Sequence, residues 1–388
     1  MKKLIAALML LLPMAASSRN TDTEINDTIP SIVEKIINQR FKTNLKIDFC
    51  TSMNANFTEN EFDEMTFKLN RLRMDFRGGI NDQFSYRVRS SFNKSYVKAS
   101  TDNIPAALEY ANIQWHPTDR FKLTVGKQFL VIGGYEALAN SMYVREFSDF
   151  NNNMSFYRVA VTGAVKLDQE KNQELLFQIS NNRSGKILDL YPAGLPAGVV
   201  QTKLPFMTSA AWNGHFADRA VNLIYAAAVA PVAKGEYIYY LSCGNIYEKA
   251  PFFAYLDIMY SREEIDTQGR ITDLLGGLTT ARNVDYLSFI ARFDYSFHPK
   301  WNVYVKGAYE TANVYAANNI YKSGEYLRNW NAQACVEWHP LGKKDGLRLF
   351  AHYLYKGYAP GEPARDMNVK MPYIQRASLG VLYVIPVL

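Results

Sequence analysis

Residues 45–57 read LKIDFCTSMNANF, and this stretch alternates strictly between two kinds of side chain. Its odd positions are mostly apolar, from Leu45 through Phe49 and Met53 to Phe57, and its even positions are mostly polar. Because successive side chains of a strand point to opposite faces, the alternation predicts a β-strand with one apolar face. The strand is also long. Strands of soluble domains average about 5–6 residues, whereas a tilted strand that crosses a membrane needs about 9–11.

The same alternation recurs along the chain, and it predicts an all-β, closed antiparallel transmembrane β-barrel. One segment, residues 67–76, changes phase at Arg71, which indicates a β-bulge. We count about sixteen strands, an even number as expected of a bacterial membrane barrel. They lie near residues 44–57, 64–78, 82–94, 106–116, 119–128, 154–165, 172–182, 206–216, 220–230, 234–246, 251–263, 285–297, 300–312, 327–339, 345–357 and 374–388.

The connections support this order of strands. With a periplasmic N-terminus, even-numbered strands end in short turns and odd-numbered ones can end in long loops. Residues 115–117 (WHP), 297–299 (FHP) and 338–340 (WHP) end the fourth, twelfth and fourteenth strands, where proline stops the ladder. The long connections follow strands 5, 7, 11, 13 and 15. These histidines have no carboxylate or cysteine at ligand spacing, so we expect turn chemistry rather than a metal site, and no cofactor.

The N-terminus has the order of a secretory signal peptide: a basic start, an apolar run and small residues. We expect residues 1–18 to be this signal, residues 19–43 to be a periplasmic extension with a short helix, and residues 44–388 to form the barrel. No later apolar run is long enough for a transmembrane helix. The formal charge of +6 is too mild to indicate nucleic-acid binding, and three widely spaced cysteines exclude a disulfide scaffold.

Four adjacent segments resemble a known family. They are residues 67–80 (FKLNRLRMDFRGGI), 84–92 (FSYRVRSSF), 108–117 (LEYANIQWHP) and 123–136 (LTVGKQFLVIGGYE). In this order they resemble the phosphate-selective porins O and P of Gram-negative outer membranes, over residues 40–165. The resemblance implies a sixteen-stranded, usually trimeric channel for small anions such as phosphate. It also implies an inward-folded third loop that narrows the pore, here at residues 129–153.

The polar face of a large barrel lines water, so strand phase predicts the pore lining. Basic residues exceed acidic ones on this face, and rings of arginine and lysine select anions. We therefore predict a porin for passive uptake of small solutes that prefers anions. The predicted pore-lining and anion-binding residues are Arg71, Arg73, Arg77, Arg87, Arg89, Lys122, Arg292, Lys306, Arg348 and Lys356 on strands, and Arg145 in the third loop.

Two other classes stay open at this point. An outer-membrane barrel enzyme, such as a hydrolase, needs a nucleophile and base near the rim. No G-x-S-x-G motif is present, and His215 and His352 are isolated in the sequence, so we predict no catalytic residues. An exported soluble β-protein is the second alternative, and it would have shorter strands. The expected partners are outer-membrane lipid, small anions and two further copies of the chain.

Overall fold

The computed structural model describes residues 43–139, 143–277, 279–318 and 320–388. The predicted signal peptide and nearly all of the predicted N-terminal extension therefore lie outside the described residues. The first strand begins at Thr43, close to the predicted start of the barrel at residue 44.

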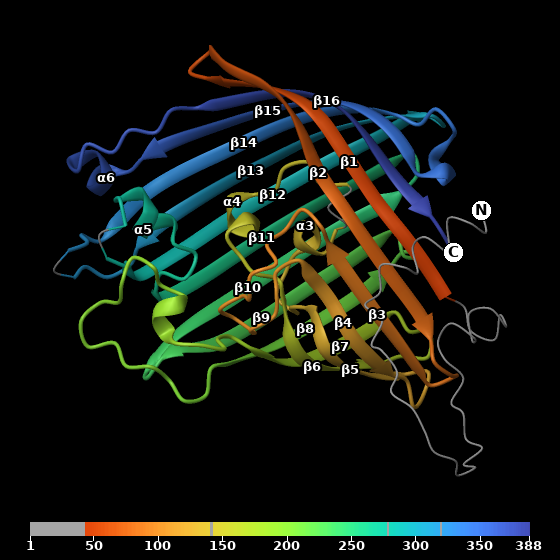
Figure 1. The fold of residues 1–388 in the computed structure, drawn as a ribbon, viewed down its shortest axis with the longest axis horizontal. Coiled ribbons are helices and arrows are strands. Elements are labelled where there is room, and N and C mark those ends of the chain that lie inside the picture. The colour runs from red at the N-terminus through yellow and green to blue at the C-terminus, as the bar shows by residue number, and fades with distance from the viewer. Residues whose placement is uncertain (1–42, 140–142, 278, 319) are drawn as a thin grey trace, which may run out of the picture. The chain divides into compact units, whose positions relative to one another are not determined.

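Within the described residues, sixteen antiparallel strands form a closed barrel in which β1 pairs with both β2 and β16 (Figure 1). This confirms the predicted fold class and strand number. The strands are β1 Thr43–Thr58, β2 Glu61–Gly79, β3 Phe84–Ser91, β4 Leu108–Trp115, β5 Phe121–Phe129, β6 Tyr157–Lys166, β7 Gln173–Asn181, β8 Phe206–Phe216, β9 Val221–Ala233, β10 Glu236–Lys249, β11 Phe252–Ile265, β12 Arg282–His298, β13 Trp301–Val314, β14 Gly324–Trp338, β15 Leu347–Pro360 and β16 Ile374–Pro386.

The helices of the described residues are short and lie in the connections. None of them is long and apolar enough to cross a membrane. They are α3 Tyr135–Leu138, α4 Asp149–Asn152, α5 Arg270–Leu274 and α6 Glu362–Asp366, with 3-10 turns at Ile187–Asp189 and Lys343–Asp345.

The two faces of the sheet have the opposite polarity from those of a soluble barrel. In β14, Asn331 and Glu337 are buried, whereas Trp330, Val336 and Trp338 are exposed. The other long strands repeat this pattern: in β12, Arg292 is buried and Phe293 is exposed. An apolar exposed face fits contact with lipid hydrocarbon, and a polar buried face fits the inside of a membrane barrel.

The strand irregularities and turns lie close to where the sequence predicts them. The pairing of β1 with β2 shifts between Cys50 and Thr51, which leaves Asn70 as the extra residue beside Arg71 and confirms the bulge. The three His-Pro turns follow β4, β12 and β14. The long connections after β5, β7, β11, β13 and β15 are confirmed at 130–156, 182–205, 266–281, 315–323 and 361–373, and a further one follows β3 at 92–107.

Candidate functional site

Two of the arginines predicted to line the lumen share one carboxylate. Asp75 on β2 lies 2.5 Å from Arg77 and 2.8 Å from Arg87. The guanidinium of Arg87 also stacks on the ring of Tyr110, 3.8 Å from its centroid. The shared carboxylate and the ring fix Arg87 in place. The trio keeps an excess of positive charge, because two cations meet one anion.

Glu109 on β4 is the centre of a second cluster. It is 1% exposed, and its carboxylate lies 2.7 Å from Arg89, 2.7 Å from Lys94 and 3.7 Å from Arg73. Arg73 also pairs with Asp48. Three cations surround the buried carboxylate of Glu109, and Asp48 joins the network through Arg73, so three cations meet two carboxylates.

Arg71 differs from these four arginines. It lies at the bulge of β2, is partly buried, and makes no hydrogen bond or ion pair within the described part of the chain. Its guanidinium can present five donors in a planar fork, which matches the geometry of a carboxylate or phosphate. Of the five arginines on β2 and β3, Arg71 therefore has the guanidinium best able to bind a solute.

The other predicted basic residues are mostly engaged in ion pairs. Lys122 on β5 makes no ion pair with any described residue. Each of the five remaining predicted residues pairs with a carboxylate: Arg145 with Glu337 at 2.7 Å, Arg292 with Asp294 at 2.6 Å, Arg348 with Glu337 at 3.6 Å, Lys306 with Glu136, and Lys356 with Asp149.

The connection 130–156, which we call the β5–β6 loop, is bound to the barrel wall through the starts of its two short helices. The backbone N–H groups of Tyr135 and Glu136 donate to Asp257 on β11, at 2.9 and 2.7 Å. Those of Asp149 and Phe150 donate to Glu310 on β13, at 2.9 and 2.8 Å. The first N–H groups of a helix have no partner within it, so carboxylates at these positions satisfy them.

Ion pairs fix the same loop to further strands. Glu136 pairs with Lys306, Asp149 with Lys356, and Glu146 lies 3.2 Å from Arg376 on β16. Burial raises the pKa of the Asp149 carboxyl and Glu310 adds to this, while Lys356 opposes both. The sequence carries no signal for these contacts, because Tyr135 and Asp257 are 122 positions apart.

An apolar core occupies part of the buried face of β8–β14. This departs from the expectation that the inward face lines water, because apolar side chains from several loops cover it there. The strands contribute Met207, Ala230, Ile238, Tyr240, Tyr255, Met259, Tyr286 and Ile290, and the loops contribute Leu130, Phe150, Tyr191, Ile271 and Tyr321. Close-packed apolar groups exclude water, so this region offers no path for a hydrated solute.

Two hollows lie beside the β5–β6 loop, and Arg71 on β2 lines both of them. The upper hollow, as we call it, is about 450 Å³, and its wall includes Arg71, Lys94 and Glu109. The lower hollow is about 160 Å³, and Lys68, Arg145 and Arg376 are among its lining residues. Arg71 and Phe147 line both hollows, so the two spaces adjoin at these side chains. Sequence reasoning did not identify Lys68, Phe147 or Arg376.

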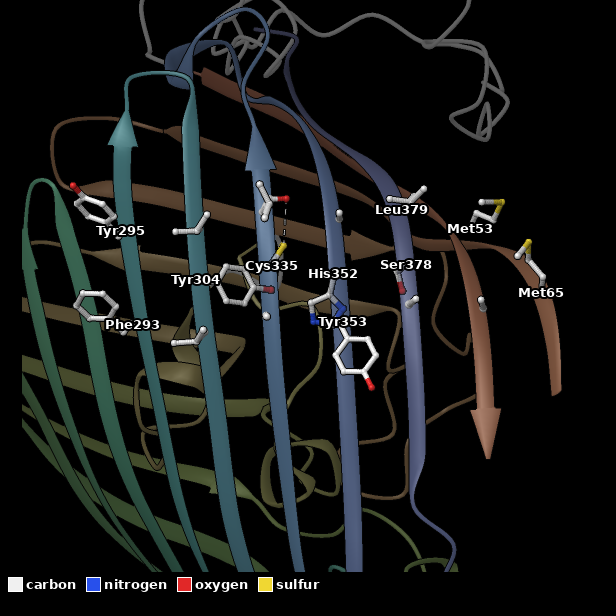
Figure 2. A pocket seen from close by; sticks show the side chains of 17 residues that line it. Met53, Met65, Phe293, Tyr295, Tyr304, Cys335, His352, Tyr353, Ser378 and Leu379 are labelled. Atoms are coloured by element: carbon white, nitrogen blue, oxygen red, sulfur yellow. Dashed lines mark hydrogen bonds between the residues drawn. The ribbon is translucent and has the colours of Figure 1, made fainter. Parts of the chain in front are cut away.

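A third hollow lies on the exposed face of the wall formed by β12–β16, β1 and β2. Figure 2 shows its lining, which includes the apolar side chains of Met53, Phe293, Tyr353 and Leu379. Small alanines lie between these larger groups, at positions 55, 334, 351 and 377. Because most of this lining consists of apolar side chains on the exposed face, the hollow belongs to the outer surface of the wall. His352 and Ser378, which also line the lower hollow, border it from the buried face.

The described residues contain no group of three or more histidine, cysteine, aspartate or glutamate side chains that could hold a metal ion. His352 lies 3.3 Å from the amide oxygen of Gln333, and His215 lies 2.5 Å from that of Asn222. Neither contact is the histidine–nucleophile pair that acyl transfer needs. Ser85 Oγ lies 3.3 Å from Nε2 of His116, but no described carboxylate is hydrogen-bonded to that ring.

Solved structures of bacterial porins share this fold. The outer-membrane channel DcaP of Acinetobacter baumannii has a TM-score of 0.60 at 11% identity, over 89% of this chain and 97% of that one. OmpF of Salmonella typhi, in complex with daunomycin, has a TM-score of 0.56 at 11% identity, over 90% of this chain and 99% of that one. An anion-selective porin from Comamonas acidovorans has a TM-score of 0.53 at 8% identity, over 89% of this chain and 100% of that one.

No curated protein matches the chain in sequence. A family model, however, covers nearly all of it, from residue 40 to residue 384. This match extends far beyond the four segments that carry the resemblance in the sequence. The chain therefore belongs to the family of phosphate-selective porins O and P, and it forms an outer-membrane channel for passive solute uptake.

Proposed function

We propose that this channel prefers anions and that Arg71 carries the preference. The observation behind the proposal is that Arg71 lines both hollows beside the β5–β6 loop and has no ion-pair partner in the described chain. Cations also outnumber carboxylates in the two clusters around it. A cleft with low-dielectric walls focuses such a charge and raises the local concentration of anions.

The solute path runs between the β5–β6 loop and the wall that carries β2, past Arg71 and Phe147. The loop folds inward and narrows the lumen, as its bonds to the buried face of β11–β16 support. The apolar core favours the same path, because its strand residues lie on β8–β14 and not on β2, which carries Arg71. Conduction needs weak and repeated binding, which spaced basic side chains such as Lys68, Arg71 and Lys122 supply.

Two further features of the proposal come from the family and its relatives, and a third comes from the order of residues at the N-terminus. The channel admits phosphate among its anions, and three copies associate in the membrane. Its N-terminal segment directs export and is then removed. One similar structure, OmpT of Vibrio cholerae, is described as a trimer.

The test is a reversal potential. Purified protein in a planar bilayer, under a KCl gradient, should show a potential whose sign reports chloride as the more permeant ion. Chloride is then exchanged for phosphate, and for a neutral sugar at equal osmolarity. A potential of zero, or one of the sign for potassium, contradicts the anion preference. Substrate turnover by the purified protein would instead support an enzyme.

A further inference from the structure

The upper hollow combines two kinds of lining. Its charged lining consists of Arg71, Lys94, Lys127 and the carboxylate of Glu109, so three cations meet one anion, and Arg71 also lines the lower hollow. Apolar side chains cover much of the rest: Phe129, Phe147, Met154, Phe156 and Tyr157, with alanines at positions 99, 106, 137 and 139. The lower hollow is different, since serine, asparagine and charged groups make up most of its lining.

The aromatic side is held in place. The rings of Phe129 and Phe156 stack at 5.3 Å with an interplanar angle of 4°, and Phe129 meets Tyr157 edge-on at 5.6 Å. The hydroxyl of Tyr157 also accepts a hydrogen bond of 2.6 Å from Arg89. These contacts present a preformed apolar surface beside the charges.

The charged side leaves one strong anion ligand. Lys127 forms an ion pair with Asp102 at 2.9 Å, and Lys94 forms one with Glu109 at 2.7 Å. Arg71 has no such partner among the described residues. A carboxylate can therefore make a bidentate contact with Arg71 without displacing an existing ion pair.

The size of the hollow also bears on the solute. Its volume of about 450 Å³ falls within the range of roughly 300–1,000 Å³ typical of small-molecule sites. Inorganic phosphate fills a small part of such a space and gains nothing from phenylalanine rings. An organic anion can cover the rings with its apolar part, because burial of apolar surface is favourable.

We propose that the upper hollow is a binding site for organic anions with a planar apolar body, of the aromatic carboxylate class. The carboxylate contacts Arg71, and the ring lies against Phe147 and Phe156. The solute then passes between Arg71 and Phe147 into the smaller, polar lower hollow. This inference rests on the proposed anion preference, and it names the solute class for the same path.

The experiment measures block of the chloride current in planar bilayers at constant ionic strength and pH 7. The two probes are benzoate and inorganic phosphate, each titrated to its half-blocking concentration. We expect benzoate to half-block at a concentration at least about 5-fold lower than phosphate. Equal or stronger block by phosphate overturns the proposal.

Variants locate the site. Phe147→Ala should raise the half-blocking concentration of benzoate roughly 3- to 10-fold, as expected for loss of one aromatic contact, and change that of phosphate less than about 2-fold. Arg71→Gln should weaken block by both anions. Phe177→Ala is the matched control, because Phe177 is 60% exposed on the outer face of β7. Equal shifts for the two anions in Phe147→Ala contradict the aromatic role.

Two further arms keep the result interpretable. Phe147→Leu retains an apolar side chain without a ring, and it replaces Phe147→Ala if that variant fails to fold; benzoate affinity should again fall more than phosphate affinity. The reversal potential in KCl is measured on the same wild-type membranes. A potassium preference refutes the proposed function, whereas a chloride preference without benzoate selectivity refutes this inference alone.

Discussion

Replacing Arg71 by glutamine should lower the anion preference of the channel. Arg71 lines a lower hollow of about 160 Å³, and a sphere of that volume has a radius of about 3.4 Å, so a permeating ion passes within about 5 Å of the guanidinium. One unit charge at about 5 Å in water contributes about 0.8 kcal/mol. Screening with a Debye length of about 10 Å at 0.1 M salt reduces this to about 0.5 kcal/mol.

The lost charge acts in opposite directions on anions and cations. The free-energy difference between them therefore changes by about 1 kcal/mol, which is a roughly 5-fold fall in the anion-to-cation permeability ratio. Reversal potentials in a KCl gradient measure this ratio. The matched control is Arg328→Gln on the exposed face of β14, where Arg328 pairs with Glu325 at 2.8 Å. An unchanged potential in Arg71→Gln, or an equal change in Arg328→Gln, refutes the reasoning.

Three other predictions follow from the same geometry. Glu310→Ala removes the acceptor for two backbone N–H groups of the β5–β6 loop, and these two hydrogen bonds together contribute about 3–5 kcal/mol. Single-channel currents should therefore be larger and noisier, and currents like those of the wild type would contradict the anchoring role of Glu310. In a chain without its native cysteines, Lys68→Cys should react with a charged methanethiosulfonate, and the reaction should reduce conductance. Ala308→Cys, which lies in the apolar core, should not react, and equal reactivity of the two cysteines argues against a core that excludes water. Leu241→Arg, on the exposed face of β10, should lower the free energy of unfolding from lipid vesicles by about 2–4 kcal/mol. Leu241→Met is the control, and an unchanged free energy of unfolding in Leu241→Arg is incompatible with a lipid-facing position.

The arginines of β2 and β3 illustrate how far the sequence reaches into the site. Strand phase places Arg71, Arg73, Arg87 and Arg89 on one face, and the structure agrees. Strand phase does not distinguish these four arginines. In the structure Arg73, Arg87 and Arg89 each bind a carboxylate, whereas Arg71 binds none among the described residues. A charge reversal at Arg87 or Arg89 therefore breaks a cluster, which makes Arg71 the cleaner probe of selectivity.

The sequence by itself determines the barrel: sixteen strands, their order, the long-loop side and the bulge beside Arg71. These features are local, because alternation and turn residues act over a few positions of the chain. The tertiary structure decides that Arg71 has no ion-pair partner among the described residues, where Asp257 and Glu310 hold the β5–β6 loop, and that an apolar core covers part of the buried face of β8–β14. Those outcomes depend on side chains more than a hundred positions apart, which meet only when the barrel closes and the loop packs against its wall.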